Sequence, residues 1–209
     1  YLLRVLSDRE VLSRMTHREL ARMRDRFRKL IEVRPHPNLE RIITIIRAES
    51  DAREERRIEE YYNFCFAAGT LVDTPSGKRK IETLIAGDKV FSFDFQQGNI
   101  AQKVIEETFQ NTASALLRLT LSDGTSLLVT EKHPFYARAD STAPWSWIES
   151  SLLKEGLLLR KRRDDNQISD VAVVKIEKTN KETKVYNFRV QDLRNYFVEG
   201  ILVHNVKRG

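Results

Sequence analysis

The chain has 209 residues, of which 41% are hydrophobic and 32% are charged. This composition predicts a globular protein of one or two domains and excludes a wholly disordered chain. Residues 1–63 and 64–209 each carry a formal charge of +3, out of +6 in total. Because the positive charge is spread evenly, we expect no dedicated nucleic-acid surface.

Cys65 is the one cysteine of the chain, so an internal disulfide is excluded. No run of about 18 apolar residues is present, and we expect no membrane span. The chain begins at Tyr1 rather than Met and stops abruptly after Gly209. We therefore expect a piece of a longer polypeptide.

Residues 1–63 contain no glycine, and 14 of their 15 basic residues are arginine, which is typical of helices. The segments 7–10 (Ser-Asp-Arg-Glu) and 16–19 (Thr-His-Arg-Glu) have the pattern of capping boxes, which predicts two helix starts. An apolar stripe with a spacing of three to four residues follows the second box, at Leu20, Met23, Phe27, Leu30 and Ile31.

Pro35-His36-Pro37 is expected to end that helix, and Asn38 is expected to cap the next one. The next helix begins apolar and becomes almost wholly polar over residues 47–57. We expect it to run through solvent as a helical lead-in to Phe64-Cys65. Acidic residues are interleaved with its arginines, which argues against a nucleic-acid-binding helix.

Residues 65–205 consist of short apolar segments separated by turn residues, which predicts a single all-β domain of 141 residues. A turn or short helix is expected at 150–156, and a charged, exposed loop at 160–170. The expected strands are 70–74, 89–93, 117–121, 125–130, 145–148, 157–159, 171–177, 184–190 and 196–203.

Three features of this region can carry chemistry. Cys65 is a candidate nucleophile, Thr130-x-x-His133 follows a predicted strand, and His204-Asn205 ends the last one. Asparagine can close its side-chain amide on its own main-chain carbonyl, which cuts the chain on its C-terminal side, and a neighbouring histidine can supply the proton. Taken singly, each feature is also compatible with a structural role, as a buried thiol or a polar strand end.

The order of these motifs along residues 65–205 resembles the Hint (hedgehog/intein) superfamily. The residues of these motifs are most similar to those of the bacterial intein-like and pretoxin Hint domains of polymorphic toxins. The resemblance implies a horseshoe-like all-β domain over 64–205, with a helical region at 1–63 before it and the start of a downstream segment at 206–209. The fold is then α+β by overall content. The motifs are Cys65–Thr70, Ile81–Leu84, Gly87–Val90, Thr130–Pro134, Val185–Phe188, Asn195–Val198 and Gly200–Asn205.

At the N-terminal junction, the resemblance implies that Cys65 attacks the carbonyl of Phe64 and converts the amide into a thioester. His133 is then expected to protonate the departing nitrogen. Thr130 and nearby backbone donors are expected to hold the oxyanion.

At the C-terminal junction, Asn205 is expected to cyclise with help from His204 and to cut the bond to Val206. Val206 has no hydroxyl or thiol to receive an acyl group, so ordinary protein splicing is not expected. Two further departures from the motifs are Arg194, where relatives often have His, and Asn187, where many inteins have Asp. Both argue against an efficient first acyl shift.

The resulting hypothesis is a single-turnover, self-cleaving domain of a secreted bacterial protein. It acts on its own flanking polypeptide and separates a downstream toxin or other effector from an upstream carrier, without a cofactor or metal. The main alternative is a degenerate Hint domain that serves as a structural or interaction module. A nucleic-acid-binding role rests only on the pI of about 9.5, and an incidental zinc site only on Cys65 with His133.

Overall fold

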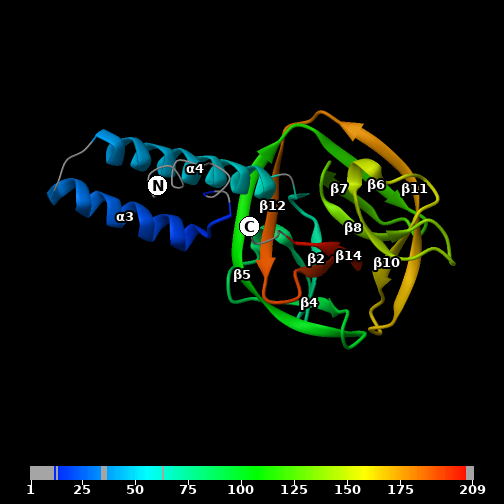
Figure 1. Ribbon diagram of the computed structural model, residues 1–209. Helices are drawn as coiled ribbons and strands as arrows, with labels where there is room; N and C mark the ends of the chain where they lie inside the picture. The colour runs from blue at the N-terminus through cyan, green and yellow to red at the C-terminus, as the bar shows by residue number, and fades with distance from the viewer. Residues whose placement is uncertain (1–11, 13, 34–36, 63, 206–209) are drawn as a thin grey trace. The chain divides into compact units, whose positions relative to one another are not determined.

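A computed structural model of the chain describes residues 12, 14–33, 37–62 and 64–205 (Figure 1). The chain divides into two compact units, Tyr1–Glu59 and Glu60–Gly209. The first is helical, and the second is built of strands with two short 3-10 turns. The predicted fold class, an all-β region preceded by helices, is therefore confirmed. No described helix is long and apolar enough to cross a membrane.

In the helical unit, helix α3 spans His17–Val33 and begins at the predicted capping box. The Thr16 N–H donates to Glu19 Oε2 at 2.7 Å, and the Glu19 N–H donates to Thr16 Oγ1 at 3.3 Å. The earlier box at 7–10 lies outside the described residues. Leu20 is fully buried, but Leu30 is 53% exposed. Leu30 lies in the last turns of α3 and is not part of the described core of this unit.

Helix α4 spans Pro37–Tyr62, so the expectation that Asn38 caps it is wrong. The proline takes the first helical position, where its fixed φ suits the helix and its missing N–H has no partner to lose. The described core of this unit combines residues around both helices: Leu12, Leu20, Ile42 and Ile46, with Met15, Met23, Phe27 and Ile45 packed against them.

The strands of the second unit form one continuous, strongly bent sheet in the described residues. Their order is β3-β2-β13-β14-β8-β10-β11-β6-β7-β1-β12-β5-β4, with β9 paired to β8. The bounds are β1 Phe66–Ala67, β2 Leu71–Thr74, β3 Gly77–Lys80, β4 Lys89–Asp94, β5 Asn99–Ala113, β6 Leu116–Leu121, β7 Ser126–Thr130, β8 Pro134–Arg138, β9 Ser146–Glu149, β10 Leu158–Arg162, β11 Ile168–Thr179, β12 Thr183–Val190, β13 Asn195–Val198 and β14 Ile201–His204. The 3-10 turns are η1 Ile81–Thr83 and η2 Ser150–Leu152.

Figure 1 shows the long strands β5 and β12 running side by side and curving along one wall of this unit. The short strand β1 lies between β7 and β12, because Phe66 pairs with both Val129 and Tyr186. The last strand, β14, pairs with β8 through Val203 and Phe135. The beginning and the end of the domain therefore both lie beside the β7–β8 connection.

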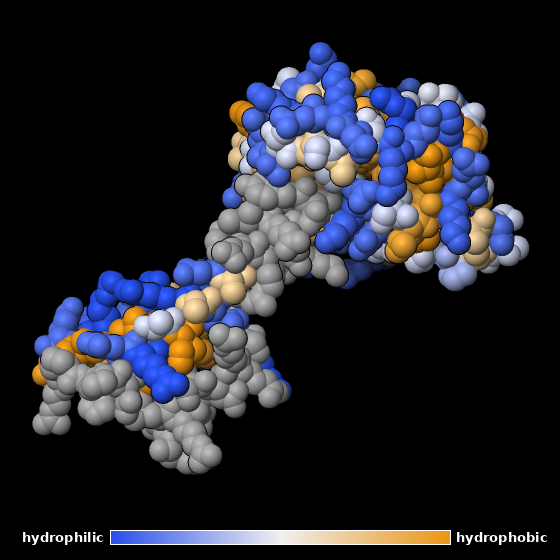
Figure 2. Space-filling model, turned by 90° about the horizontal axis from the view of Figure 1, so that it is seen from above, coloured by the Kyte–Doolittle hydropathy of each residue, from blue (hydrophilic) through white to orange (hydrophobic). Residues whose placement is uncertain are grey.

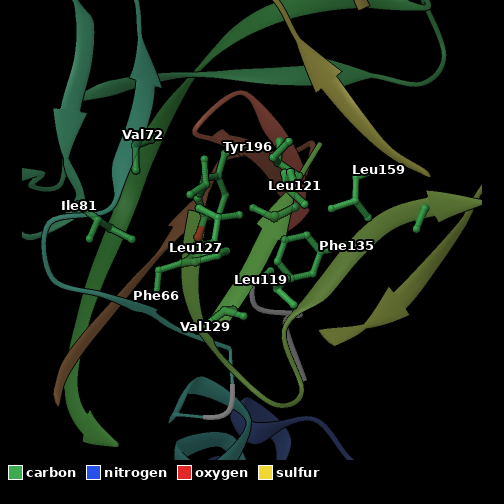
Figure 3. Packing of buried hydrophobic residues seen from close by; sticks show 14 of the residues in the cluster. Phe66, Val72, Ile81, Leu119, Leu121, Leu127, Val129, Phe135, Leu159 and Tyr196 are labelled. Atoms are coloured by element: carbon green, nitrogen blue, oxygen red, sulfur yellow. The ribbon is translucent and has the colours of Figure 1, made fainter. Parts of the chain in front are cut away.

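The interior is filled by apolar side chains from nearly every strand. In Figure 3, Phe66, Val129, Leu119 and Phe135 lie between the strands, and all four are fully buried. Burying a side chain of this size contributes about 1.5–3 kcal/mol to stability. On the face seen in Figure 2, polar and charged residues cover most of this unit, with smaller hydrophobic areas between them.

Two predicted elements are wrong. The charged loop at 160–170 is instead a hairpin of β10 and β11, in which Lys161 pairs with Ser169. The strand predicted at 196–203 is two strands, β13 and β14, separated by a turn in which Glu199 and Gly200 have φ values of 50° and 81°. The 15-residue strand β5 and the strand β8 were not predicted.

Candidate active site

Thr130, the last residue of β7, forms hydrogen bonds with the main chain of Cys65. The Cys65 N–H donates to Thr130 Oγ1 at 2.8 Å, and the Thr130 N–H donates to the Cys65 carbonyl at 3.0 Å. The Thr130 hydroxyl also donates to that carbonyl, at 3.2 Å. Cys65 is fully buried, and this burial raises the pKa of its thiol to about 12. The thiol is therefore protonated near neutral pH.

The turn from Thr130 to His133 is closed by hydrogen bonds to its main-chain carbonyl groups. The His133 N–H donates to the Thr130 carbonyl at 3.3 Å. Ser150, at the start of η2, donates its hydroxyl to the Thr130 carbonyl at 2.6 Å and its N–H to the His133 carbonyl at 2.9 Å. Ser150 is fully buried, and sequence reasoning gave it no such role because it lies in a different turn.

The His133 ring is completely buried and packs beside both neighbours of Cys65. Its centroid lies 4.3 Å from that of Phe66 and 6.3 Å from that of Phe64. Burial first, and then the charge of His204, lower the pKa of His133 to about 3, against the opposing effect of backbone groups of Phe64 and His204. Neither ring nitrogen has a well-formed hydrogen bond within the described residues. His133 is therefore neutral at physiological pH, with its ring near backbone groups of Phe64 and His204.

The carbonyl oxygen of Phe64 is contacted by Asn187 of β12, whose Nδ2 donates to it. Thr130, which is expected to hold this oxygen, exchanges hydrogen bonds with the nitrogen and the carbonyl of Cys65, and its role at the Phe64 oxygen stays a prediction. Asn187 itself accepts hydrogen bonds at Oδ1 from the Tyr196 hydroxyl at 2.9 Å and from the Phe188 N–H at 2.8 Å. The sequence motif contains Asn187 and Tyr196, but residue types alone do not reveal their contact.

His204 is the last residue of β14, and its ring is turned toward Asn205. His204 Nδ1 contacts the main-chain carbonyl oxygen of Asn205. Because a carbonyl oxygen can only accept, this contact requires the proton on Nδ1. The ring meets Trp147 edge-on, with 5.0 Å between centroids. The imidazole is thus held at the oxygen of the bond that cyclisation would break.

The side chain of Asn205 is only 1% exposed and is held by main-chain groups. One orientation of its amide satisfies both ends: Nδ2 donates to the Arg194 carbonyl at 2.8 Å, and Oδ1 accepts from the Val190 N–H at 2.5 Å. The opposite orientation leaves Nδ2 with the Val190 carbonyl at 3.3 Å and points an oxygen at the Arg194 carbonyl. The first orientation is the favourable one, because in the second two acceptors face each other and repel.

Arg194 reaches Asn205 through its backbone. Its carbonyl also accepts the Asn205 N–H at 2.9 Å, and its φ of 52° lies in the left-handed region. The Arg194 side chain is exposed. Arg194 therefore contacts Asn205 with its main chain.

The structure brings the predicted residues together in two adjoining groups. Cys65, Thr130 and His133 surround the Phe64–Cys65 bond, and His204 and Asn205 form the second group. His133 joins them, because backbone groups of Phe64 and His204 both act on its ring. Val206, which follows Asn205 across the predicted C-terminal cleavage site, lies outside the described residues. The described residues contain no cluster of three or more His, Cys, Asp or Glu side chains suited to a metal ion.

A family model described as the pretoxin Hint domain matches residues 71–206. The chain belongs to this family. The matched span includes Thr130, His133, His204 and Asn205, and it begins six residues after Cys65. The predicted membership of the Hint superfamily is confirmed, and the family is one of autoprocessing domains.

Solved structures agree with this assignment. The solution structure of a bacterial intein-like domain from Clostridium thermocellum is 32% identical, with 68% of this chain and 99% of that chain covered and a TM-score of 0.59. A DnaB intein from Synechocystis sp. is 17% identical, with 68% and 99% covered and a TM-score of 0.60. An intein from a hyperthermophile is 21% identical, with 68% and 99% covered and a TM-score of 0.59. The two inteins support the Hint fold alone. No curated protein matches the chain significantly.

Proposed function

We propose that this Hint domain cuts its own chain once, at the Asn205–Val206 bond, by cyclisation of the Asn205 side chain. One observation carries the proposal: His204 Nδ1 contacts the Asn205 carbonyl oxygen while the backbone of Arg194 and Val190 holds the Asn205 amide. Nucleophile and electrophile belong to the same residue, and both are held in a buried site, which lowers the entropic part of the barrier. Membership of the pretoxin Hint family supports the same chemistry.

In the proposed step, Asn205 Nδ2 attacks the main-chain carbonyl carbon of the same residue. A C–N bond forms within the succinimide, the C–N bond to Val206 breaks, and one amide proton ends on the released amino group of Val206. No water is consumed until the succinimide hydrolyses. His204 Nδ1–H stabilises the tetrahedral oxygen. The Arg194 carbonyl accepts an N–H of the amide, which increases the electron density on the attacking nitrogen.

We propose a second reaction at Phe64–Cys65, in which the Cys65 thiol forms a thioester with the Phe64 carbonyl. Thr130 contacts the leaving nitrogen, and the neutral His133 can relay the thiol proton to it. Because Val206 cannot accept the acyl group, this thioester ends in hydrolysis or thiolysis, and the flanks are not joined.

The proposed roles of the chain segments follow from these two cuts. Residues 1–63 belong to the upstream carrier, residues 64–205 are the autoprocessing domain, and residues 206–209 begin the segment that is released. The N-terminal cut would leave Phe64, the first residue of the domain, attached to the carrier. The family's description as a pretoxin domain supports a toxin or other effector as that segment. The domain acts on its own flanking polypeptide and turns over once.

The test uses the chain extended beyond Gly209 by a reporter protein and followed by intact mass spectrometry. We expect a fragment ending at Asn205 from the parent chain and from Cys65→Ala, but none from Asn205→Ala. A parent chain that stays intact through long incubation, with and without added thiol, would instead support the alternative of a degenerate Hint module. A fragment that forms equally from Asn205→Ala would refute the cyclisation.

A further inference from the structure

The carboxamide of Asn187 is locked in one orientation. Its Oδ1 accepts from the Tyr196 hydroxyl at 2.9 Å and from the Phe188 N–H at 2.8 Å. Because an amide oxygen can accept both hydrogen bonds and an NH₂ group can accept neither, the nitrogen must face the other way. On that side Nδ2 donates to the carbonyl oxygen of Phe64. Asn187 and Tyr196 are both at least 99% buried, and the hydrogen bond to the Phe64 carbonyl is partly buried.

The Phe64 carbonyl belongs to the peptide bond that Cys65 attacks under the proposed function. Negative charge develops on this oxygen when the tetrahedral intermediate forms, and a donor that is already fixed in position stabilises that charge. We propose that Asn187 is the oxyanion donor of the N-terminal reaction, and that Tyr196 is the positioning residue that keeps its NH₂ group on the Phe64 carbonyl. This inference rests on the proposed function and adds two residues to it.

The surroundings explain why a neutral amide suits this position. The buried Cys65 thiol is protonated near neutral pH, so the reaction begins from a weak nucleophile and depends on a polarised carbonyl. Burial raises the pKa of Tyr196 well above its ordinary value, and a Cys65 thiolate raises it further, so the phenol stays a donor. An aspartate at 187 would have the same shape but would turn an anionic oxygen toward the developing oxyanion.

The step balances without any proton from Asn187. The Cys65 Sγ–C bond forms, the bond from the Phe64 carbonyl carbon to the Cys65 nitrogen breaks, and the thiol proton ends on that nitrogen. Asn187 donates a hydrogen bond throughout and keeps both of its protons. An added thiol then attacks the thioester, which restores the Cys65 thiol and releases residues 1–64 as a new thioester.

The experiment measures this release in the full chain carrying Asn205→Ala, with 2-mercaptoethanesulfonate as the thiol and mass spectrometry as the readout. We expect Asn187→Ala and the isosteric Asn187→Asp to slow release about 10²–10³-fold, the usual cost of losing one oxyanion donor. The rate of release in Tyr196→Phe should lie between the rates of these variants and that of the parent. The rate of Asn187→Asp should rise as the pH falls, because a protonated carboxyl group regains a donor.

C-terminal cleavage provides the matched control. With Cys65→Ala in place of Asn205→Ala and a reporter beyond Gly209, the Asn187 and Tyr196 variants should still cut at Asn205 at the parent rate. The inference is overturned if Asn187→Asp releases residues 1–64 at the parent rate, if the parent forms no thioester, or if both cleavages slow equally. Absence of C-terminal cleavage from the parent refutes the proposed function instead, so the two failures are distinguishable.

Discussion

The Nδ1 atom of His204 contacts the carbonyl oxygen of Asn205, the next residue along the chain. The histidine ring therefore lies against the main chain that immediately follows it. The side-chain amide of Asn205 is itself held by hydrogen bonds to the backbone of Arg194 and Val190. Acid and nucleophile are therefore organised around one peptide bond.

Removing this imidazole should slow C-terminal cleavage. Loss of a positioned general acid typically costs about 10²–10⁴-fold in rate, and we expect His204→Ala to fall in this range. The rate constant is measured from the disappearance of the extended chain by intact mass. His17→Ala, which removes an imidazole from the helical region, should leave it unchanged. A parent-like rate in His204→Ala would exclude the histidine from the reaction.

Arg194 should act through its backbone conformation. Its side chain is exposed, so Arg194→Ala should change the C-terminal cleavage rate no more than about twofold, in line with ordinary surface substitutions. Arg194→Val places a β-branched residue at a φ of 52°. Left-handed backbone costs such a residue about 1–2 kcal/mol, so a shifted carbonyl and a roughly tenfold slower reaction are expected. Equal slowing by Ala and Val would show that the guanidinium is needed.

Thr130 should contribute to stability as well as to chemistry. Thr130→Val keeps the shape but leaves the buried N–H of Cys65 without its acceptor, which costs about 1–3 kcal/mol. Thr130→Ser keeps the hydroxyl and should be less affected. Urea unfolding of both variants, in a chain also carrying Asn205→Ala, measures the difference. Equal unfolding free energies for Val and Ser would mean that the hydroxyl contact contributes nothing.

The sequence motifs located Cys65, Thr130, His133, His204 and Asn205, because each is tied to a strand end at a fixed spacing. They did not assign the partner of each side chain. Asn187 was interpreted as a weakness of the first acyl shift, whereas its contact with Phe64 O depends on β1 lying against β12. Such a contact joins segments more than 100 residues apart, which residue spacing cannot encode.

The errors in secondary structure also have tertiary causes. The basic residues at 160–162 were interpreted as a loop, but in β10 they meet acids from distant segments: Lys161 pairs with Asp123, and Arg162 pairs with Asp73 at 2.7 Å. Strand β5 lacks a clear apolar pattern and is held by pairing with β4 and β12 on its two sides. Neighbouring strands thus overrode weak local preferences.

His133 should make the folded chain sensitive to acid. Its pKa is about 3 when folded and 6.5 when unfolded, so the unfolded chain binds a proton that the folded chain excludes. Stability therefore falls as the pH drops from 6.5 toward 3, by about 1.4 kcal/mol for each pH unit.

His133→Gln cannot titrate and should remove this contribution. Between about pH 7 and pH 4.5, the variant should lose about 2–3 kcal/mol less unfolding free energy than the parent. Urea unfolding at the two pH values, with both chains carrying Asn205→Ala, provides the comparison. Parallel losses in both chains would mean that His133 is not held neutral in the folded state.

The mass of the fragment that ends at Asn205, recorded at the earliest detectable times, tests the central claim most directly. Cyclisation predicts a fragment lighter by one water molecule than the free acid, since its C-terminus is a succinimide. This form should appear first and later convert to the free acid by hydrolysis. A fragment that carries a free carboxylate from the first time point would contradict the account, because water rather than the Asn205 amide would then have cut the chain.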